Sequence, residues 1–122
     1  MALEENAETF SYKKVAATKF KKLLGTKVQV SRYTIPIVYC KDLVVGGDHC
    51  AGCYDYINRC IYINIESPES VVETFFHEVF HAEIIEGGVR QHPLWCKDVE
   101  EIVVEILSRS IAFGFLIRAR NG

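Results

Sequence analysis

The sequence has no long apolar run, no excess of charge of one sign and no basic, apolar start. Across its 122 residues, 14 basic side chains oppose 16 acidic ones, which leaves a net charge of −2. This near balance of charge argues against a protein that binds nucleic acid mainly by electrostatic attraction. The longest apolar stretch, Ile111 to Ile117, is far shorter than the roughly 18 residues that a membrane span requires. We therefore expect no contact with a membrane.

The first residues, Met1 to Glu5, are acidic where a signal peptide is basic and then apolar, which predicts a cytoplasmic protein. The five cysteines are an odd number, a poor disulfide framework in a reducing compartment, so we interpret them as thiols or metal ligands. Cys50 and Cys53 form one Cys-x-x-Cys pair, but a structural zinc site needs a second pair, which is missing. No repeat or linker divides the chain, which predicts a single domain over residues 1–122.

The spacing of apolar residues predicts an α+β fold. It combines an N-terminal helix, a small mixed or antiparallel sheet with a hairpin, a helix carrying a His-Glu-x-x-His motif and a C-terminal ligand helix. Ser67 is expected to cap the motif helix, with Pro68 at its first position, and Gly87 to end it. The expected elements are a helix from about Glu8 to Leu24 capped by Gly25, strands within Lys27–Tyr39, a loop over Asp42–Gly52, a hairpin over Tyr54–Ile65 reversing at Asp55–Arg59, and a last helix from about Asp98 to Ala119.

A basic cluster runs along the first of these segments. We interpret it as a solvated helix face, and the alternative is a surface for nucleic acid or for an acidic partner. Its members are Lys13, Lys14, Lys19, Lys21, Lys22 and Lys27.

The motif His77-Glu78-Val79-Phe80-His81 carries the predicted chemistry. Residues four apart are neighbours on a helix, so His77 and His81 can reach one zinc ion. Glu78 follows His77 by about 100° around the helix, beside the open coordination side, where a carboxylate can take a proton from a zinc-activated water. The pattern predicts a single catalytic zinc ion with Glu78 as the general base.

A catalytic zinc site needs a third protein ligand, which we expect from the last helix. Glu100 lies among apolar positions on the helical wheel, and a carboxylate on an apolar face is costly unless it is paired or binds metal. Glu101 and Glu105 point towards the polar side. We therefore predict Glu100 as the third ligand, with Glu101 in reserve, while a glutamate favoured by the helix dipole is the alternative for Glu100.

From Tyr54 to Ile111 the sequence resembles the small, often phage-encoded zinc metallopeptidases of the minimal gluzincin type, which are related to ImmA/IrrE-like and SprT-like domains. The motif Glu73 to Ala82 and the acidic start of the last helix carry this resemblance. It implies His77 and His81 as ligands, Glu78 as base and a glutamate of the last helix as third ligand. It also implies that the strand before the metal helix binds an extended peptide by β-addition.

The sequence therefore predicts a zinc-dependent metallopeptidase, a hydrolase whose partner is a peptide or protein substrate. His92, in the loop between the two ligand helices, is a candidate stabiliser of the transition state. One alternative is a zinc-containing binding or structural protein without catalysis, such as a phage assembly or host-interaction factor. Another is a protease recruited to DNA through the Lys13–Lys27 segment, which the balanced net charge disfavours.

Overall fold

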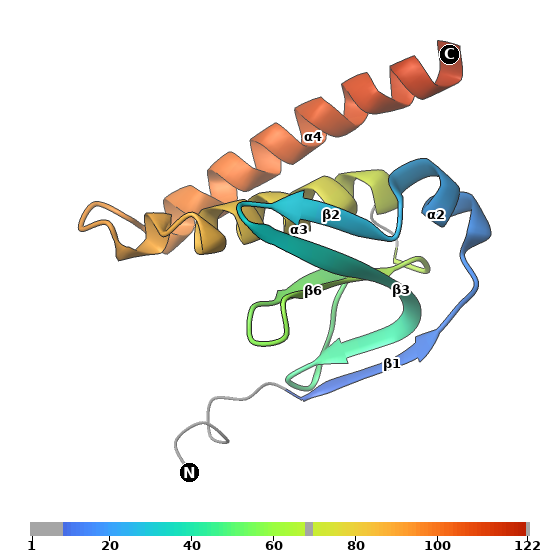
Figure 1. The fold of residues 1–122 in the computed structure, drawn as a ribbon, viewed down its shortest axis with the longest axis horizontal. Coiled ribbons are helices and arrows are strands. Elements are labelled where there is room, and N and C mark those ends of the chain that lie inside the picture. Colours follow the sequence, from blue (N-terminus) through green and yellow to red (C-terminus); the bar gives the residue numbers. More distant parts are fainter. Residues whose placement is uncertain (1–8, 68–69, 122) are drawn as a thin grey trace.

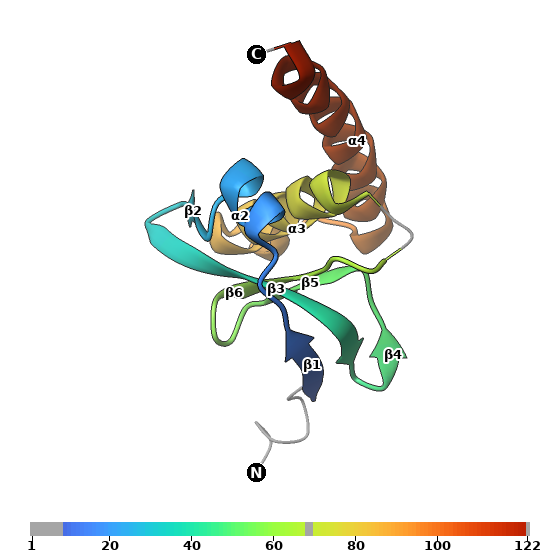
Figure 2. The same cartoon turned by 90° about the vertical axis from the view of Figure 1, so that its right-hand side faces the viewer.

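The computed structural model describes residues 9–67 and 70–121, and in them the expected α+β class is confirmed (Figure 1). A mixed six-stranded sheet forms one layer, helix α3 covers one of its faces, and helix α4 lies across α3 on the side away from the sheet (Figure 2). No helix in these residues is both long and apolar enough to cross a membrane. The elements are β1 (Phe10–Lys14), α2 (Thr18–Leu24), β2 (Lys27–Val30), β3 (Tyr33–Val45), β4 (Asp48–His49), β5 (Gly52–Asp55), β6 (Cys60–Asn64), α3 (Val71–Glu86), the 3-10 turn η1 (Val89–Gln91) and α4 (Lys97–Asn121).

Strand β3 organises the sheet, whose main path runs β1-β3-β6-β5. It pairs in parallel with β6, where Ile37 lies opposite Ile61, and all other pairings are antiparallel. Strand β5 therefore lies at one edge of the sheet. The β5–β6 reversal is the predicted hairpin, and the Asp55 carboxylate accepts hydrogen bonds from the backbone N–H groups of Ile57 and Asn58 in its turn.

Strand β6 is buried on both faces, because alternate side chains enter two separate cores. Ile61 and Ile63 are fully buried on the side covered by α3, where Phe75 and Ala82 also pack. Tyr62 enters the second core, on the other face of the sheet, and its ring stacks on that of Phe10 at a centroid distance of 5.0 Å.

The predicted helix from Glu8 to Leu24 is wrong over most of its length, and its first residue, Glu8, lies outside the described part of the chain. Residues Phe10–Lys14 form strand β1, paired with β3, and only Thr18–Leu24 are helical. Phe10 and Tyr12 alternate with polar residues, and both rings pack on Tyr62. This alternation, typical of a strand with one buried face, decides the structure here rather than the helical spacing of apolar residues. Gly25 caps the short helix as predicted.

The basic cluster is consequently divided among three elements, β1, α2 and β2, and all six of its lysines are exposed. The expected loop over Asp42–Gly52 is also shorter than predicted. Strand β3 continues to Val45, and a turn at Gly46 and Gly47, both with positive φ, leads into β4.

Helix α3 begins later than predicted. Its N-cap is Ser70, whose hydroxyl accepts a hydrogen bond from the backbone N–H of Glu73, rather than Ser67. Pro68 lies outside the described residues. The helix ends at Gly87 as predicted. Helix α4 runs from Lys97 to Asn121 and packs along α3.

Candidate metal centre

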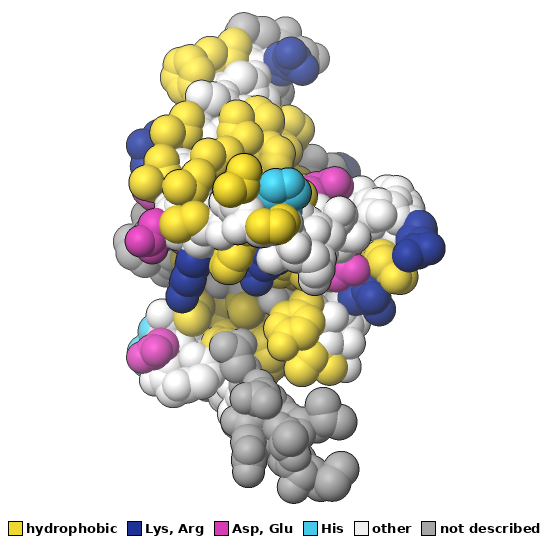
Figure 3. All heavy atoms as spheres, turned by 90° about the vertical axis from the view of Figure 1, so that its left-hand side faces the viewer, with side chains coloured by type: hydrophobic (Ala, Val, Ile, Leu, Met, Phe, Trp, Pro, Cys, Tyr) yellow, Lys and Arg dark blue, Asp and Glu magenta, His cyan; other side chains and the backbone are white. Residues whose placement is uncertain are grey.

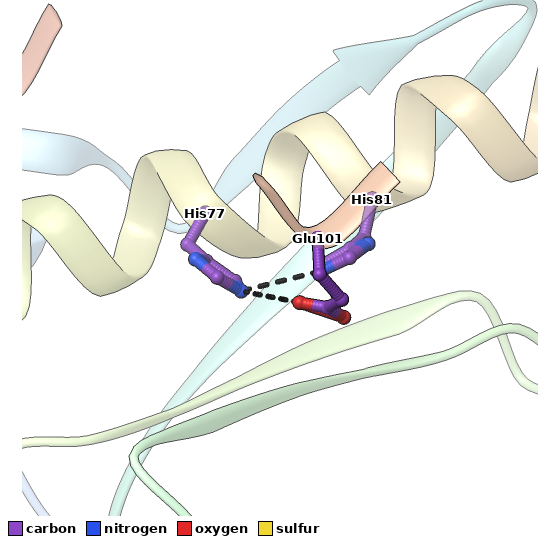
Figure 4. A group of neighbouring side chains, drawn as sticks. All are labelled: His77, His81 and Glu101. Carbon is purple, nitrogen blue, oxygen red and sulfur yellow. Dashed lines mark hydrogen bonds and ion pairs between the residues drawn. The ribbon is translucent and has the colours of Figure 1, made fainter. Parts of the chain in front are cut away.

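Helix α3 presents His77 and His81 on one side, one turn apart, facing the beginning of α4 (Figure 4). Their Nε2 atoms lie 3.2 Å apart. His81 is buried, whereas His77 is partly exposed. The two imidazoles therefore aim the same ring nitrogen at one point, as a shared metal ion requires.

Glu101 at the start of α4 completes this group. One carboxylate oxygen lies 3.2 Å from His81 Nε2, and the other lies 3.9 Å from His77 Nε2. Among the residues that the structure describes, His77, His81 and Glu101 are the one set of three His, Cys, Asp or Glu side chains placed to hold a metal ion. The Glu101 side chain is 52% exposed, so the group opens to solvent on one side.

Glu100, the predicted third ligand, lies beside Nδ1 of His81, on the side of the ring away from His77. Glu101, the predicted reserve ligand, lies beside the two Nε2 atoms, where the third ligand was expected. The Glu100 carboxylate is buried, as the helical wheel predicts, and accepts four hydrogen bonds. His81 Nδ1 lies 2.6 Å from it, Arg90 donates two bonds of 2.9 and 2.6 Å, and Trp95 Nε1 donates one of 2.8 Å. These donors occupy the lone pairs that a metal ion would need.

This arrangement makes Glu100 the partner that orients His81. The hydrogen bonds from Arg90 lower the pKa of the Glu100 carboxyl to about 2, those from Trp95 and His81 add to the effect, and burial opposes it. A neutral His81 that donates from Nδ1 keeps the lone pair of Nε2 pointing at His77 and Glu101. Carboxylates in this position behind a histidine ligand fix its tautomer and raise its basicity.

Glu78 faces the same opening from α3, beside His77. Burial raises the pKa of its carboxyl to about 8, the nearby Glu101 carboxylate adds to this, and a hydrogen bond from the Tyr54 backbone opposes it. Gly52 of β5 lies directly against this part of α3. A Cβ on Gly52 would be 3.1 Å from Glu78 Cγ and 2.6 Å from Thr74 Cγ2, so only glycine allows this approach of strand and helix.

The histidines and Glu78 line an open cleft of about 550 Å³ between α3 and strand β5. Residues of β5 and of the β5–β6 turn form its other wall, including Tyr54, Asp55 and Asn58. The strand directly before the metal helix is β6, which has β3 on one side and β5 on the other. The strand edge available for β-addition is therefore that of β5, which corrects the expectation from the resemblance.

His92, the predicted stabiliser of the transition state, does not reach this cleft. It is exposed, its Nδ1 accepts a hydrogen bond from the backbone N–H of Leu94, and it lines a separate apolar pocket at the start of α4. No group of three potential ligands in the described chain includes a cysteine. Cys40 and Cys60 are buried free thiols, and Cys96 is exposed.

The sequence reasoning missed the roles of Arg90 and Trp95. Both lie in the connection between α3 and α4, and both donate to Glu100. A signal for Arg90 was present, because a carboxylate on an apolar helix face needs a cation and Arg90 is the one basic side chain between Gly87 and Cys96.

Comparison of this chain with protein-family models, with curated proteins and with solved structures finds no match.

Proposed function

We propose that the protein is a zinc-dependent metallopeptidase in which His77, His81 and Glu101 hold the ion and Glu78 is the general base. The observation that carries this proposal is the convergence of three ligand atoms beside a carboxylate in an open cleft. The gluzincin-type fold, with a motif helix and a C-terminal ligand helix, is part of the same proposal.

The spacing of the ligand atoms supports the choice of metal. Ligands about 2.0–2.1 Å from a zinc ion lie about 3.4 Å from one another at the corners of a tetrahedron. The two Nε2 atoms are 3.2 Å apart, and Glu101 approaches His81 Nε2 to 3.2 Å with one oxygen and His77 Nε2 to 3.9 Å with the other. With one ligand atom from each residue, the three atoms lie within 4.8 Å of one another, so a small adjustment of the side chains would bring them to this value. Two imidazoles and one carboxylate, with a fourth direction open, are typical of catalytic rather than structural zinc sites.

Zinc bound here would polarise a substrate carbonyl and lower the pKa of a water molecule to about 7. In this proposal Glu78 accepts a proton from the attacking water and passes it to the amine that leaves. The positive charge of a bound zinc ion would lower the raised pKa of the Glu78 carboxyl and keep it ionised for this role. Glu100 holds the His81 ring in orientation, since hydrogen bonds from Arg90 and Trp95 fix the Glu100 carboxylate itself.

The substrate class follows from the wall of the cleft opposite the metal group. Strand β5 is an edge strand, so its outer backbone groups can pair with an extended peptide. Such pairing places a peptide bond along the strand and near His77 and Glu78. Because backbone pairing is independent of side chains, we expect recognition of extended segments of varied sequence.

The proposal is tested by zinc content and by hydrolysis of a fluorescence-quenched peptide library. The wild type should bind one zinc ion per chain and cleave peptides, and the activity should be lost with a chelator. Glu78→Gln should keep the zinc and lose at least 1000-fold in kcat/KM, while the matched change Glu83→Gln, on an exposed position of the same helix, should alter neither.

The other outcomes are equally informative. A wild type that binds zinc without cleaving any peptide indicates the binding or structural protein. Absence of zinc after purification in its presence rejects the metal site itself. The lysines are divided among β1, α2 and β2 rather than gathered on one helix, and salt-sensitive DNA binding through them would favour the protease recruited to DNA.

A further inference from the structure

The outer face of α4, away from α3, is apolar and exposed. Hydrophobic side chains gather in a broad patch over this helix (Figure 3). Phe113 is 68% exposed and Ile106 is 57% exposed, although both are large apolar residues. The exposed large apolar residues of α4 are Val99, Ile102, Val103, Ile106, Leu107, Ile111, Phe113, Leu116 and Ile117. Contiguous exposed apolar surface of this kind marks a site of interaction.

The centre of this face follows a heptad spacing. Successive steps of four and three residues along α4 connect a row of exposed positions, on a different side of the helix from its buried residues Glu100, Val104, Ser108 and Ala112. In helices that pack on another helix at a shallow angle, the residues at the contact line, or seam, have this spacing. The seam positions are Val99, Val103, Ile106, Ser110, Phe113 and Ile117, all of them exposed.

We propose that this seam packs against the same seam of a second copy of the chain, with the two α4 helices antiparallel. In this arrangement each smaller seam residue faces a larger one. Val99 lies opposite Ile117, Val103 opposite Phe113, and Ser110 opposite Ile106. Parallel helices would instead place Phe113 against Phe113 and bury two Ser110 hydroxyls together. The antiparallel seam is thus self-complementary, as a twofold interface requires.

The exposed apolar area of α4 is that of a standard interface only when the residues beside the seam are included. At about 200 Å² for each fully exposed large apolar side chain, the five apolar seam residues present roughly 500 Å² per chain and all nine exposed apolar residues of α4 roughly 900 Å², against about 800 Å² per partner in a standard interface. A stable dimer therefore covers the seam together with its flanking apolar residues. Both sides of the interface lie opposite α3, so the two sheets would lie outside the helix pair.

A separate pocket supplies an anchor point. The apolar pocket that His92 lines, of about 290 Å³, is also bordered by Leu94, Trp95, Val99 and Val103. In the antiparallel pair, Phe113 of one chain lies next to Val103 of the other, at the mouth of this pocket. A highly exposed aromatic side chain opposite an apolar pocket is typical of the residues that dominate binding energy.

The charges that flank the seam favour a protein partner over a lipid surface. Helices that lie on membranes carry Lys and Arg along the polar face. The exposed charged residues of α4 have both signs, namely Lys97, Asp98, Glu101, Glu105, Arg109 and Arg118. Arg109 is already paired with Glu105 at 2.8 Å, so no continuous basic face flanks the seam.

Sedimentation equilibrium of the full chain tests the dimer. The wild type should have twice the monomer mass of 13.9 kDa at micromolar concentration. Ile106→Glu should raise the dissociation constant at least 100-fold. Ile57→Glu, at an isoleucine of nearly equal exposure on the β5–β6 turn, is the matched control and should remain dimeric. Circular dichroism should show both variants folded, because both positions are exposed in the single chain.

A size exchange tests the orientation. Val103→Phe alone places two phenylalanines opposite each other and should weaken the dimer at least 10-fold. The double variant Val103→Phe/Phe113→Val restores one large and one small residue in each pair and should recover the dimer. Failure of this recovery overturns the antiparallel pairing. A wild type that is monomeric at 100 µM overturns the dimer. If this monomer binds phosphatidylcholine–phosphatidylglycerol vesicles, the apolar face of α4 is a lipid-binding surface instead. None of these outcomes depends on zinc or on peptidase activity.

Discussion

The two faces of α4 reverse the usual amphipathic pattern. The face against α3 buries a carboxylate, Glu100, and a hydroxyl, Ser108, beside Val104 and Ala112. The face away from α3 exposes large apolar side chains such as Ile106 and Phe113. An ordinary surface helix places these groups the other way round. The proposed metal site would account for the inner face of α4, and the proposed second copy of the chain would account for its outer face.

The largest expected effect is on zinc affinity, at the edge of the inner face of α4 where Glu101 lies beside His77 and His81. Glu101→Ala removes one of three proposed protein ligands, so zinc affinity should fall at least 1000-fold with little change in the stability of the metal-free protein. Competition with a chromophoric chelator measures the affinity. Glu105→Ala, one turn further along and equally solvated, should bind zinc as the wild type does. Equal affinities of both variants would falsify the assignment of Glu101.

Glu100→Gln should have the next largest effect. The amide cannot accept all the bonds from Arg90, Trp95 and His81, so zinc affinity should fall about 10–100-fold, as for other partners of histidine ligands. Loss of hydrogen bonds to a charged group should also lower the free energy of unfolding by about 1–3 kcal/mol. Urea denaturation without metal measures this. If Glu100 were the ligand itself, its effect on zinc would exceed that of Glu101→Ala.

The stability of the metal-free protein should fall in acid because of the same carboxylate. The pKa of Glu100 is about 2 in the folded chain, below the ordinary 4.5, so its contribution is complete above pH 4.5 and is lost as the pH falls towards 2. The loss is worth about 3 kcal/mol, at about 1.4 kcal/mol for each pKa unit. Urea midpoints from pH 5 to pH 2.5 should therefore depend less on pH in Glu100→Gln than in the wild type. Parallel curves for the two proteins would contradict this account.

The smallest effect is expected at the other polar group of the inner face. Ser108 is fully buried, but its hydroxyl donates to the Glu105 carbonyl of its own helix at 3.2 Å. Such a bond does not connect α4 to α3, and alanine is the better helix former. Ser108→Ala should therefore change the free energy of unfolding by less than about 1 kcal/mol and leave zinc binding intact. A larger loss would mean that Ser108 contributes to the packing of the two helices.

Local patterns in the sequence predicted the elements that depend on neighbouring residues. The motif helix, its end at Gly87 and the hairpin turn at Asp55 follow from spacing, capping and turn chemistry. Strand β1 was mistaken for helix because its partners are distant. Val45 of β3 lies opposite Phe10, and no local signal records that pairing.

The choice between two adjacent glutamates shows the same limit at the site. The helical wheel correctly placed Glu100 on the buried side of α4. It carried no information about Arg90 and Trp95, which approach from the preceding connection and occupy the Glu100 carboxylate. With Glu100 engaged, the exposed neighbour Glu101 is the one that reaches the histidines.

Trp95 is the single tryptophan of the chain, and its position gives the protein a built-in optical probe. Its indole donates to Glu100, one hydrogen bond away from His81, and its ring borders the apolar pocket at the start of α4. Intrinsic emission excited at the indole absorption band therefore comes from one place in the molecule. The proposed metal binding and the proposed association through α4 can each be tested in unlabelled protein, the first by metal titration and the second by dilution.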